Sequence, residues 1–175
     1  NFINDIAILN KLGFIPIVIH GGGKRISEKL KDAGIKSDFI NGLRITDKKS
    51  IKIVEEVLNK FNEEITESLE KNQCASEGIN SKNKNILIVE QENKELGFVG
   101  MPKQIKHSII EQVVREKKVP VVAPLGLNTI NQVFNIKADT AAGAIAKKLN
   151  ARRLIIMSDV EGVLDKEKKL ISEIN

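Results

Sequence analysis

The stretch Val18-Ile19-His20-Gly21-Gly22-Gly23 leads from an apolar, β-branched run (15–19) into three consecutive glycines and then into an amphipathic segment, 24–33. Continuous β-branched residues are typical of a strand buried on both faces of a parallel sheet. Because glycine lacks a Cβ, it lets a ligand approach the main chain closely. A helix that begins after such a bend presents unpaired amide hydrogens and partial positive charge. The junction therefore predicts an anion site for a phosphate or a carboxylate. A tight strand-to-helix turn is the alternative, and it needs only one or two glycines.

Strand and helix patterns alternate along the rest of the chain. Short apolar runs predict further strands at 86–89, 119–123, 131–136 and 154–157. Apolar residues at three-to-four spacing predict helices at 24–33, 47–69, 105–114 and 139–149. Asp47 is the expected N-cap of the longest helix. This order predicts an α/β fold, a three-layer αβα sandwich with a mainly parallel central sheet.

Composition limits the classes of function. The chain has 175 residues, enough for one domain with a core, and its net charge of +5 comes from lysines scattered among acidic residues. Because tryptophan and tyrosine are absent and the basic residues are not clustered, nucleic-acid binding is not expected. A single cysteine, Cys74, excludes an internal disulfide and a Cys-x-x-Cys metal site. No apolar run approaches the roughly 20 residues that span a bilayer, so we expect no membrane partner and a cytoplasmic location.

Ligands of open α/β sheets bind beyond the carboxyl ends of the strands. In this chain those ends carry the glycine bend, Pro124-Leu125-Gly126 and the segment 158–162, and Asn135 and Asp139 flank another turn. Two familiar phosphate-binding motifs are absent. A Walker A loop would need glycine at position 18, and a dinucleotide fingerprint would need glycine at position 26, where valine and isoleucine stand. The anion site therefore belongs to another class of nucleotide-handling protein.

Six blocks of sequence resemble the amino-acid kinase family, in the family's order and over nearly the whole chain. They are Val18-Ile19-His20-Gly21-Gly22-Gly23, Asn41-Gly42-Leu43-Arg44-Ile45-Thr46-Asp47, Leu96-Gly97-Phe98-Val99-Gly100, Val121-Val122-Ala123-Pro124-Leu125-Gly126, Asn135-Ile136-Lys137-Ala138-Asp139-Thr140-Ala141-Ala142-Gly143 and Ser158-Asp159-Val160-Glu161-Gly162-Val163-Leu164-Asp165. Within the family, the resemblance is to the kinases that phosphorylate the side-chain carboxylate of N-acetyl-L-glutamate in arginine biosynthesis.

The resemblance implies a role for each matching residue. Gly21, Gly22 and Gly23 would contact the substrate and the transferred phosphoryl group, while Arg44 and Asn135 would bind the substrate. A surface ion pair is the alternative role for Arg44. Asp139 would be the catalytic carboxylate that holds two lysines in place, and its alternative role is the N-cap of the helix that follows. The nucleotide pocket would be lined by Asp159, Val160, Glu161, Gly162, Val163 and Leu164.

The implied reaction is an in-line transfer of the γ-phosphoryl group of ATP, with Mg²⁺ bridging phosphate oxygens. No resident metal site is implied. Because a carboxylate acceptor is already ionised at pH 7, no general base is needed, and His20 is expected to be structural. The family's two lysines lie in segments before position 1 and after position 175. We therefore expect 1–175 to be a partial domain that is inactive by itself, with 1–125 as the acyl-amino-acid half and 126–175 as the start of the nucleotide half.

Two positions depart from the family's pattern. The segment Gly78-Ile79-Asn80-Ser81-Lys82-Asn83 stands where the family has Gly-Leu-Ser-Gly-Lys-Asp, and Lys137 interrupts Asn-Val-Asn-Ala-Asp, its charge facing either solvent or the site. Two other functions stay open: a sister kinase acting on a carrier-linked aminoadipate, and a non-catalytic ligand-binding or regulatory module of the same fold. Helix 47–69 forms a dimer interface in the family, which implies a homo-oligomer, with packing on its own core as the alternative.

Overall fold

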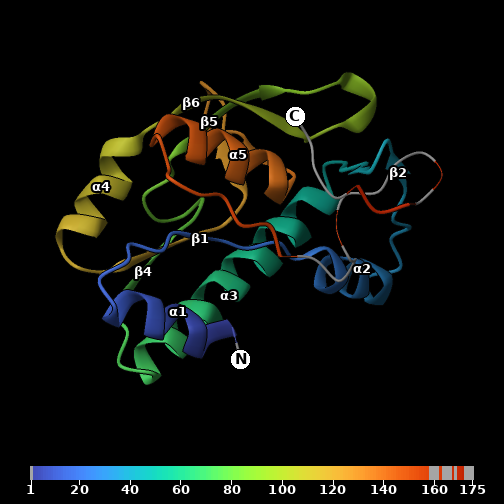
Figure 1. Ribbon diagram of the computed structural model, residues 1–175. Helices are drawn as coiled ribbons and strands as arrows, with labels where there is room; N and C mark the ends of the chain where they lie inside the picture. Colours follow the sequence, from blue (N-terminus) through green and yellow to red (C-terminus); the bar gives the residue numbers. More distant parts are fainter. Residues whose placement is uncertain (1, 158–161, 163–166, 168, 172–175) are drawn as a thin grey trace.

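The computed structural model describes residues 2–157, 162, 167 and 169–171 (Figure 1). In chain order the elements are α1 (Phe2–Lys11), β1 (Val18–Ile19), α2 (Gly23–Asp32), β2 (Phe39–Ile40), β3 (Leu43–Arg44), α3 (Ser50–Lys71), β4 (Ser76–Ile79), β5 (Leu87–Gln91), the 3-10 turn η1 (Lys94–Leu96), β6 (Gly100–Ile105), α4 (His107–Arg115), β7 (Val119–Val122), β8 (Leu125–Leu127), β9 (Val133–Asn135) and α5 (Ala138–Lys148).

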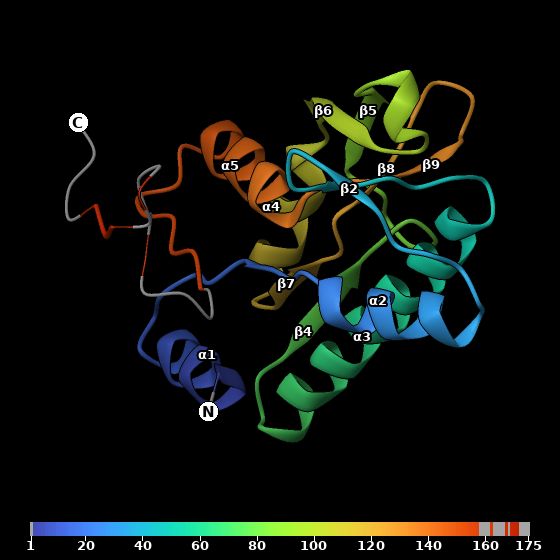
Figure 2. The same ribbon diagram turned by 90° about the vertical axis from the view of Figure 1, so that its right-hand side faces the viewer.

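The central sheet has the strand order β1-β7-β4, and both pairings are parallel. Figures 1 and 2 show α1 and α3 on one side of this sheet and α4 and α5 on the other. The side chains of β7 alternate between the two sides. Val119 and Val121 pack with residues of α1 and α3, whereas Val122 packs with residues of α4 and α5. The predicted three-layer α/β arrangement with a parallel central sheet is therefore confirmed.

A second sheet of four strands, in the order β6-β5-β8-β9, extends the structure beyond the central sheet. Its β5–β6 and β8–β9 pairings are antiparallel, and only β5–β8 is parallel. The periodicity predicts a helix from position 105, but 105 is the buried last residue of β6, and α4 begins two residues later. Tertiary pairing with β5 therefore decides the conformation of this segment, overriding its local spacing.

The longest helix, α3, begins at Ser50 instead of at the predicted position 47. Asp47 nevertheless closes its first turn, because its Oδ1 accepts hydrogen bonds from the amides of Lys49 and Ser50 at 3.0 and 2.7 Å. The apolar stripe of α3 packs against α1, α2 and the central sheet. A homo-oligomer through this helix remains a prediction, and it would use the largely charged face that core packing leaves exposed.

The predicted strand at 154–157 is not formed. Its four apolar side chains are between 47% and 76% exposed, and within the described residues no strand pairs with this segment. The sequence pattern is that of a buried strand, but a strand also needs a neighbouring edge that completes its hydrogen bonds. Among the helices that the structure describes, none is long and apolar enough to cross a membrane.

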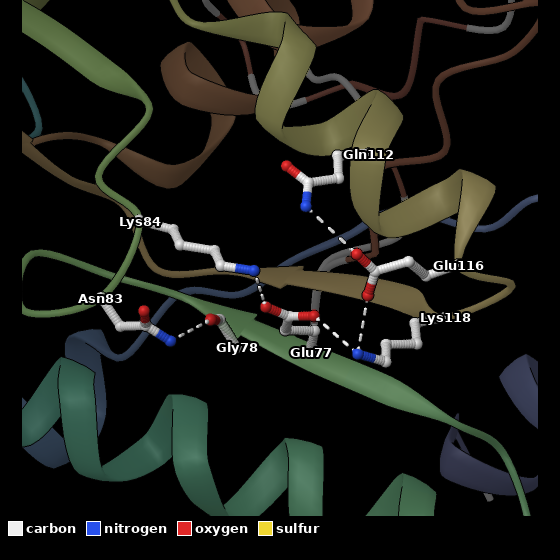
Figure 3. Close-up of polar contacts among 7 residues, drawn as sticks. All are labelled: Glu77, Gly78, Asn83, Lys84, Gln112, Glu116 and Lys118. Carbon is white, nitrogen blue, oxygen red and sulfur yellow. Dashed lines mark hydrogen bonds and ion pairs between the residues drawn. The ribbon is translucent and has the colours of Figure 1, made fainter.

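Glu77 of β4 lies between two lysines in the charged cluster of Figure 3. Its carboxylate accepts hydrogen bonds from Lys84 and Lys118, the latter at 3.1 Å, and Lys118 also contacts Glu116 at 2.8 Å. Burial alone would raise the pKa of Glu77, but the hydrogen bonds and charges of the two lysines outweigh it and lower the pKa. Through these contacts, Lys84 in the loop after β4 and Lys118 in the loop before β7 are both held against β4.

Replacing Glu77 by glutamine is expected to lower the free energy of unfolding at pH 7 by about 1 kcal/mol. Because the folded pKa is below the unfolded one, the stabilisation is fully present above the unfolded value of roughly 4.3 and is lost as the pH falls through the folded value. Urea unfolding at pH 7 and at pH 3 measures this. The exposed pair Glu90–Lys103 supplies the control, since Glu90→Gln should have little effect at either pH. A Glu77→Gln deficit of equal size at both pH values would contradict the prediction.

Candidate functional site

A cavity of about 160 Å³ lies at the carboxyl end of the central sheet, where the chain passes from β1 into α2. The sequence-predicted substrate residues converge on it, because Gly21, Gly22, Gly23, Arg44 and Asn135 all line its wall. These residues come from three separate parts of the chain: the bend after β1, the β2–β3 hairpin and the end of β9. Tertiary folding therefore gathers five residues that the sequence places up to 114 positions apart.

Two helices begin at the wall of this cavity. Gly22 is the N-cap of α2 and Lys137 is the N-cap of α5, and both N-cap residues line the cavity. Neither of them makes a side-chain capping hydrogen bond. The first amide hydrogens of both helices therefore lack a side-chain cap, and both helix dipoles place partial positive charge at the cavity. This geometry suits an anionic ligand.

The glycines serve close approach and not an unusual backbone conformation. None of Gly21, Gly22 and Gly23 has a positive φ. A Cβ at Gly22 would lie 2.7 Å from Cδ2 of Leu58, which also lines the cavity, whereas a Cβ at Gly23 would meet nothing within 4 Å. Gly22 therefore lets α3 pack against the bend, and Gly23 leaves open space in front of the main chain.

Arg44 connects the hairpin to the glycine bend. Its Nη2 donates to the carbonyl oxygen of Gly23 at 3.0 Å and to Oγ of Ser27 at 2.9 Å, and its Nη1 donates to Oγ of Ser37. The guanidinium also stacks on the ring of Phe39, with Cζ 4.6 Å from the ring centroid. Arg44 is only 7% exposed, and no carboxylate within the described part of the chain forms an ion pair with it.

The charge of Arg44 is therefore buried without an anionic partner among the residues that the structure describes. Burial lowers its pKa, but an arginine remains protonated at any physiological pH. A buried charge that has only neutral acceptors is costly, and a ligand carboxylate would relieve that cost. A surface ion pair, the alternative role for Arg44, is wrong, because the side chain is buried and its partners are neutral.

A buried polar cluster of His20, Asn62 and Asn80 is hydrogen-bonded to the glycine bend. Nδ1 of His20 lies 2.9 Å from the carbonyl oxygen of Gly21, so this nitrogen carries the proton and donates it. Nε2 then accepts from the side-chain amide of Asn62, at 3.2 Å, and Asn62 in turn accepts from Asn80 at 3.3 Å. Burial, the largest effect, lowers the pKa of His20, which keeps the ring neutral in this arrangement. His20 has the structural surroundings that the sequence analysis expects.

Asp139 does not line the cavity. It lies in the first turn of α5, two residues after the N-cap Lys137, so the alternative that Asp139 is itself the N-cap is wrong. Its carboxylate is 57% exposed and lies 3.8 Å from Nζ of Lys137. Of the residues predicted to bind nucleotide, only Gly162 belongs to the described residues, and it is not part of the cavity wall. Asp159, Val160, Glu161, Val163 and Leu164 lie outside the described residues.

Leu58, Val99 and Pro124 supply apolar surface to the wall. Val99 and Pro124 belong to two of the six sequence blocks that resemble the amino-acid kinase family, whereas nothing in the sequence context of Leu58 separates it from the core residues of α3. Phe39 is harder still to find, because it precedes the Asn-Gly block and reaches Arg44 only through the β2–β3 hairpin. Among the described residues no group of three or more histidine, cysteine, aspartate or glutamate side chains could hold a metal ion.

Known proteins are similar to this chain over its whole length. A family model described as the amino acid kinase family matches residues 1–175. The acetylglutamate kinase of Pelagibacter ubique is 60% identical over 174 residues, and that of Campylobacter fetus is 40% identical over 177 residues. The alignments cover 99% and 100% of this chain, which spans 60% and 63% of the lengths of these two relatives.

Solved structures show the same architecture. The crystal structure of smu.665 from Streptococcus mutans matches with a TM-score of 0.87 and 28% identity, over 94% of this chain and 68% of that one. An N-acetylglutamate synthase from Neisseria gonorrhoeae, solved with coenzyme A and N-acetyl-glutamate, matches with a TM-score of 0.81 and 19% identity, over 96% of this chain and 39% of that one. At 19% identity this second match speaks for the fold alone.

Proposed function

Because the chain belongs to the amino acid kinase family, we propose that its cavity binds N-acetyl-L-glutamate and that the protein transfers the γ-phosphoryl group of ATP to the side-chain carboxylate of that substrate. The product is an acyl phosphate. ATP enters as its magnesium complex, as is usual for phosphoryl transfer from ATP. Arginine biosynthesis is the pathway that the activity implies.

One observation carries the proposal: the buried guanidinium of Arg44 has no carboxylate partner in the described part of the chain and is hydrogen-bonded to the carbonyl of Gly23. A guanidinium fork matches a carboxylate in two parallel hydrogen bonds, and we assign the α-carboxylate of the substrate to it. Because both Nη atoms of Arg44 already donate to neutral acceptors, the carboxylate takes the place of the serine hydroxyls when it binds. Asn135, on the same wall, offers amide hydrogen bonds to the acyl-amino-acid backbone. The side-chain carboxylate then extends to the glycine bend.

The remaining chemistry follows from charge. The acceptor carboxylate is ionised at neutral pH, so the site needs no general base, and the catalytic task is to position two anions and neutralise them. Amide hydrogens at the starts of α2 and α5 are placed where negative charge accumulates during the transfer. Asp139, near the start of α5, is the proposed organiser of the catalytic cations.

The proposed function also includes a division of the chain into two halves and an assembly of several copies. The first is a division into an acyl-amino-acid half at 1–125 and the beginning of a nucleotide half at 126–175, with 159–164 in the nucleotide pocket. The position of the cavity supports it, because residues 135–138 from the second part close a wall built mostly from the first. The second element is a homo-oligomer through the exposed face of α3, and the resemblance to the family alone supports it.

Calorimetric titration of the 175-residue chain tests the substrate assignment. We expect saturable binding of N-acetyl-L-glutamate in the micromolar to millimolar range that is typical of metabolic enzymes, roughly 1 μM to 1 mM. N-acetyl-D-glutamate has the same charges and atoms and is the matched control ligand. It should bind at least about tenfold more weakly, because it cannot place its α-carboxylate and acetyl group on the same partners. Equal affinity for the two enantiomers, or no binding of the L form, would contradict the proposal.

A further inference from the structure

Lys137 occupies the wall between two cavities. It lines the 160 Å³ cavity together with Asn135 and Ala138, and it also lines a neighbouring cavity of about 40 Å³ together with Thr140. Its side chain is 48% exposed, so the ammonium keeps contact with water and is not locked into the core. The sequence left open whether the charge of Lys137 faces solvent or the site, and this position places the residue at the site.

A lysine is an unfavourable choice at this position. Lys137 is the N-cap of α5 and makes no side-chain capping hydrogen bond. Asparagine, aspartate, serine and threonine are preferred there because their side chains accept a hydrogen bond from the first turn. A positive charge at a helix N-terminus also opposes the helix dipole. The helix thus forgoes a cap and carries an adverse charge, which indicates that position 137 serves something other than the stability of α5.

Asp139 keeps the ammonium of Lys137 near the helix start, with Nζ 3.8 Å from Oδ2. Both side chains are about half exposed, at 48% and 57%, and an ion pair of this kind is weak. The ammonium can therefore exchange Asp139 for an incoming anion at little cost. The exposed ion pair with Asp139 therefore leaves the ammonium of Lys137 available for a ligand anion, whereas an ion pair with a buried carboxylate would not.

We propose that Lys137 is a second ligand-binding cation of the cavity and makes the site select dianionic over monoanionic acyl-amino acids. The inference rests on the proposed function. Arg44 lines the cavity from the β2–β3 hairpin and Lys137 lines it from the loop between β9 and α5, so the two cationic residues belong to different walls. N-acetyl-L-glutamate carries two carboxylates. Arg44 binds the α-carboxylate, and Lys137 neutralises the side-chain carboxylate before and during transfer.

The test compares wild type with Lys137→Asn by calorimetric titration of N-acetyl-L-glutamate and of N-acetyl-L-glutamine, whose side-chain amide removes one charge without changing its shape. For Lys137→Asn we expect about fivefold weaker binding of the dianion and unchanged binding of the monoanion. The thermal midpoint should rise, because asparagine caps α5 and the adverse charge is gone. A purely structural role for Lys137 would not produce weaker binding in a more stable protein.

Lys147→Asn is the matched control variant. Lys147 lies in the last turn of the same helix, ten residues from Lys137 and thus about 15 Å along the axis, and its removal changes the net charge equally. It should leave both affinities unchanged. An unchanged ratio of the two affinities in Lys137→Asn, with wild type binding N-acetyl-L-glutamate normally, would overturn the inference alone. Failure of wild type to bind N-acetyl-L-glutamate would instead overturn the proposed function.

Discussion

Replacing Arg44 by alanine is expected to weaken binding of N-acetyl-L-glutamate by about 100-fold, which corresponds to loss of a charge-assisted pair worth roughly 3 kcal/mol. The guanidinium is buried, has no carboxylate partner among the described residues and is held by Gly23 and Ser27. A ligand carboxylate that reaches it therefore gains a charge that is already desolvated and oriented, and the variant loses that interaction. Calorimetric titration measures the loss.

Two further variants show whether geometry or charge is responsible. Arg44→Lys keeps the positive charge but cannot make two parallel hydrogen bonds, so most of the loss should remain. Arg25→Ala is the matched control, because Arg25 lies on α2 close to the bend but already pairs with Glu64 at 2.6 Å and stacks on Phe61. It should bind N-acetyl-L-glutamate within about twofold of wild type. Wild-type affinity in a folded Arg44→Ala protein would remove Arg44 from the ligand site.

Replacing Gly97 by alanine is expected to lower the free energy of unfolding by about 3 kcal/mol, from a left-handed backbone and a steric clash together. Gly97 has a φ of +70°, and a Cβ there would collide with the carbonyl oxygen of Thr46. That carbonyl cannot move freely, because it accepts the amide of Phe98 at 2.7 Å, while the amide of Thr46 donates to Leu96 at 2.9 Å. Urea unfolding measures the effect.

Gly34→Ala separates the two causes. Gly34 has nearly the same φ, +68°, but a Cβ there would meet nothing within 4 Å, so only the backbone cost of about 1 kcal/mol is expected. The difference between the two variants contains the close approach of Gly97 to Thr46 together with the cost of its ψ of −122°, which lies outside the left-handed helical region. Equal losses in the two variants would show that the main chain at Thr46 adapts without cost. Because Oγ1 of Thr46 donates to the carbonyl of Arg44 at 2.9 Å, Gly97→Ala should also weaken ligand binding.

Elements whose signals are local can be predicted from the amino-acid sequence alone. A nearly continuous β-branched run, three glycines and an amphipathic segment predict a strand over 15–19, the bend and α2. The structure has these elements in that order, but β1 covers only Val18–Ile19, and Ile15 is 65% exposed. The helix α3 and the buried strand β7 can be predicted equally well, because the spacing of apolar side chains indicates which of them are buried. The bend, Arg44 and Asn135 were assigned to one site from sequence blocks, and they do line one cavity.

Features that depend on partners distant in the chain follow from the way the separate elements pack. β4, with the sequence Ser-Glu-Gly-Ile, has no strand pattern and exists because it pairs with β7 in parallel register. The segment 154–157 has the pattern and no described partner, and it forms no strand. The meeting of Arg44 with Gly23, and of Lys137 with both cavities, depends on how separate elements pack. Local spacing records which side chains avoid water, whereas the pairing of strands and the walls of a site are set by non-local contacts that no single window of sequence contains.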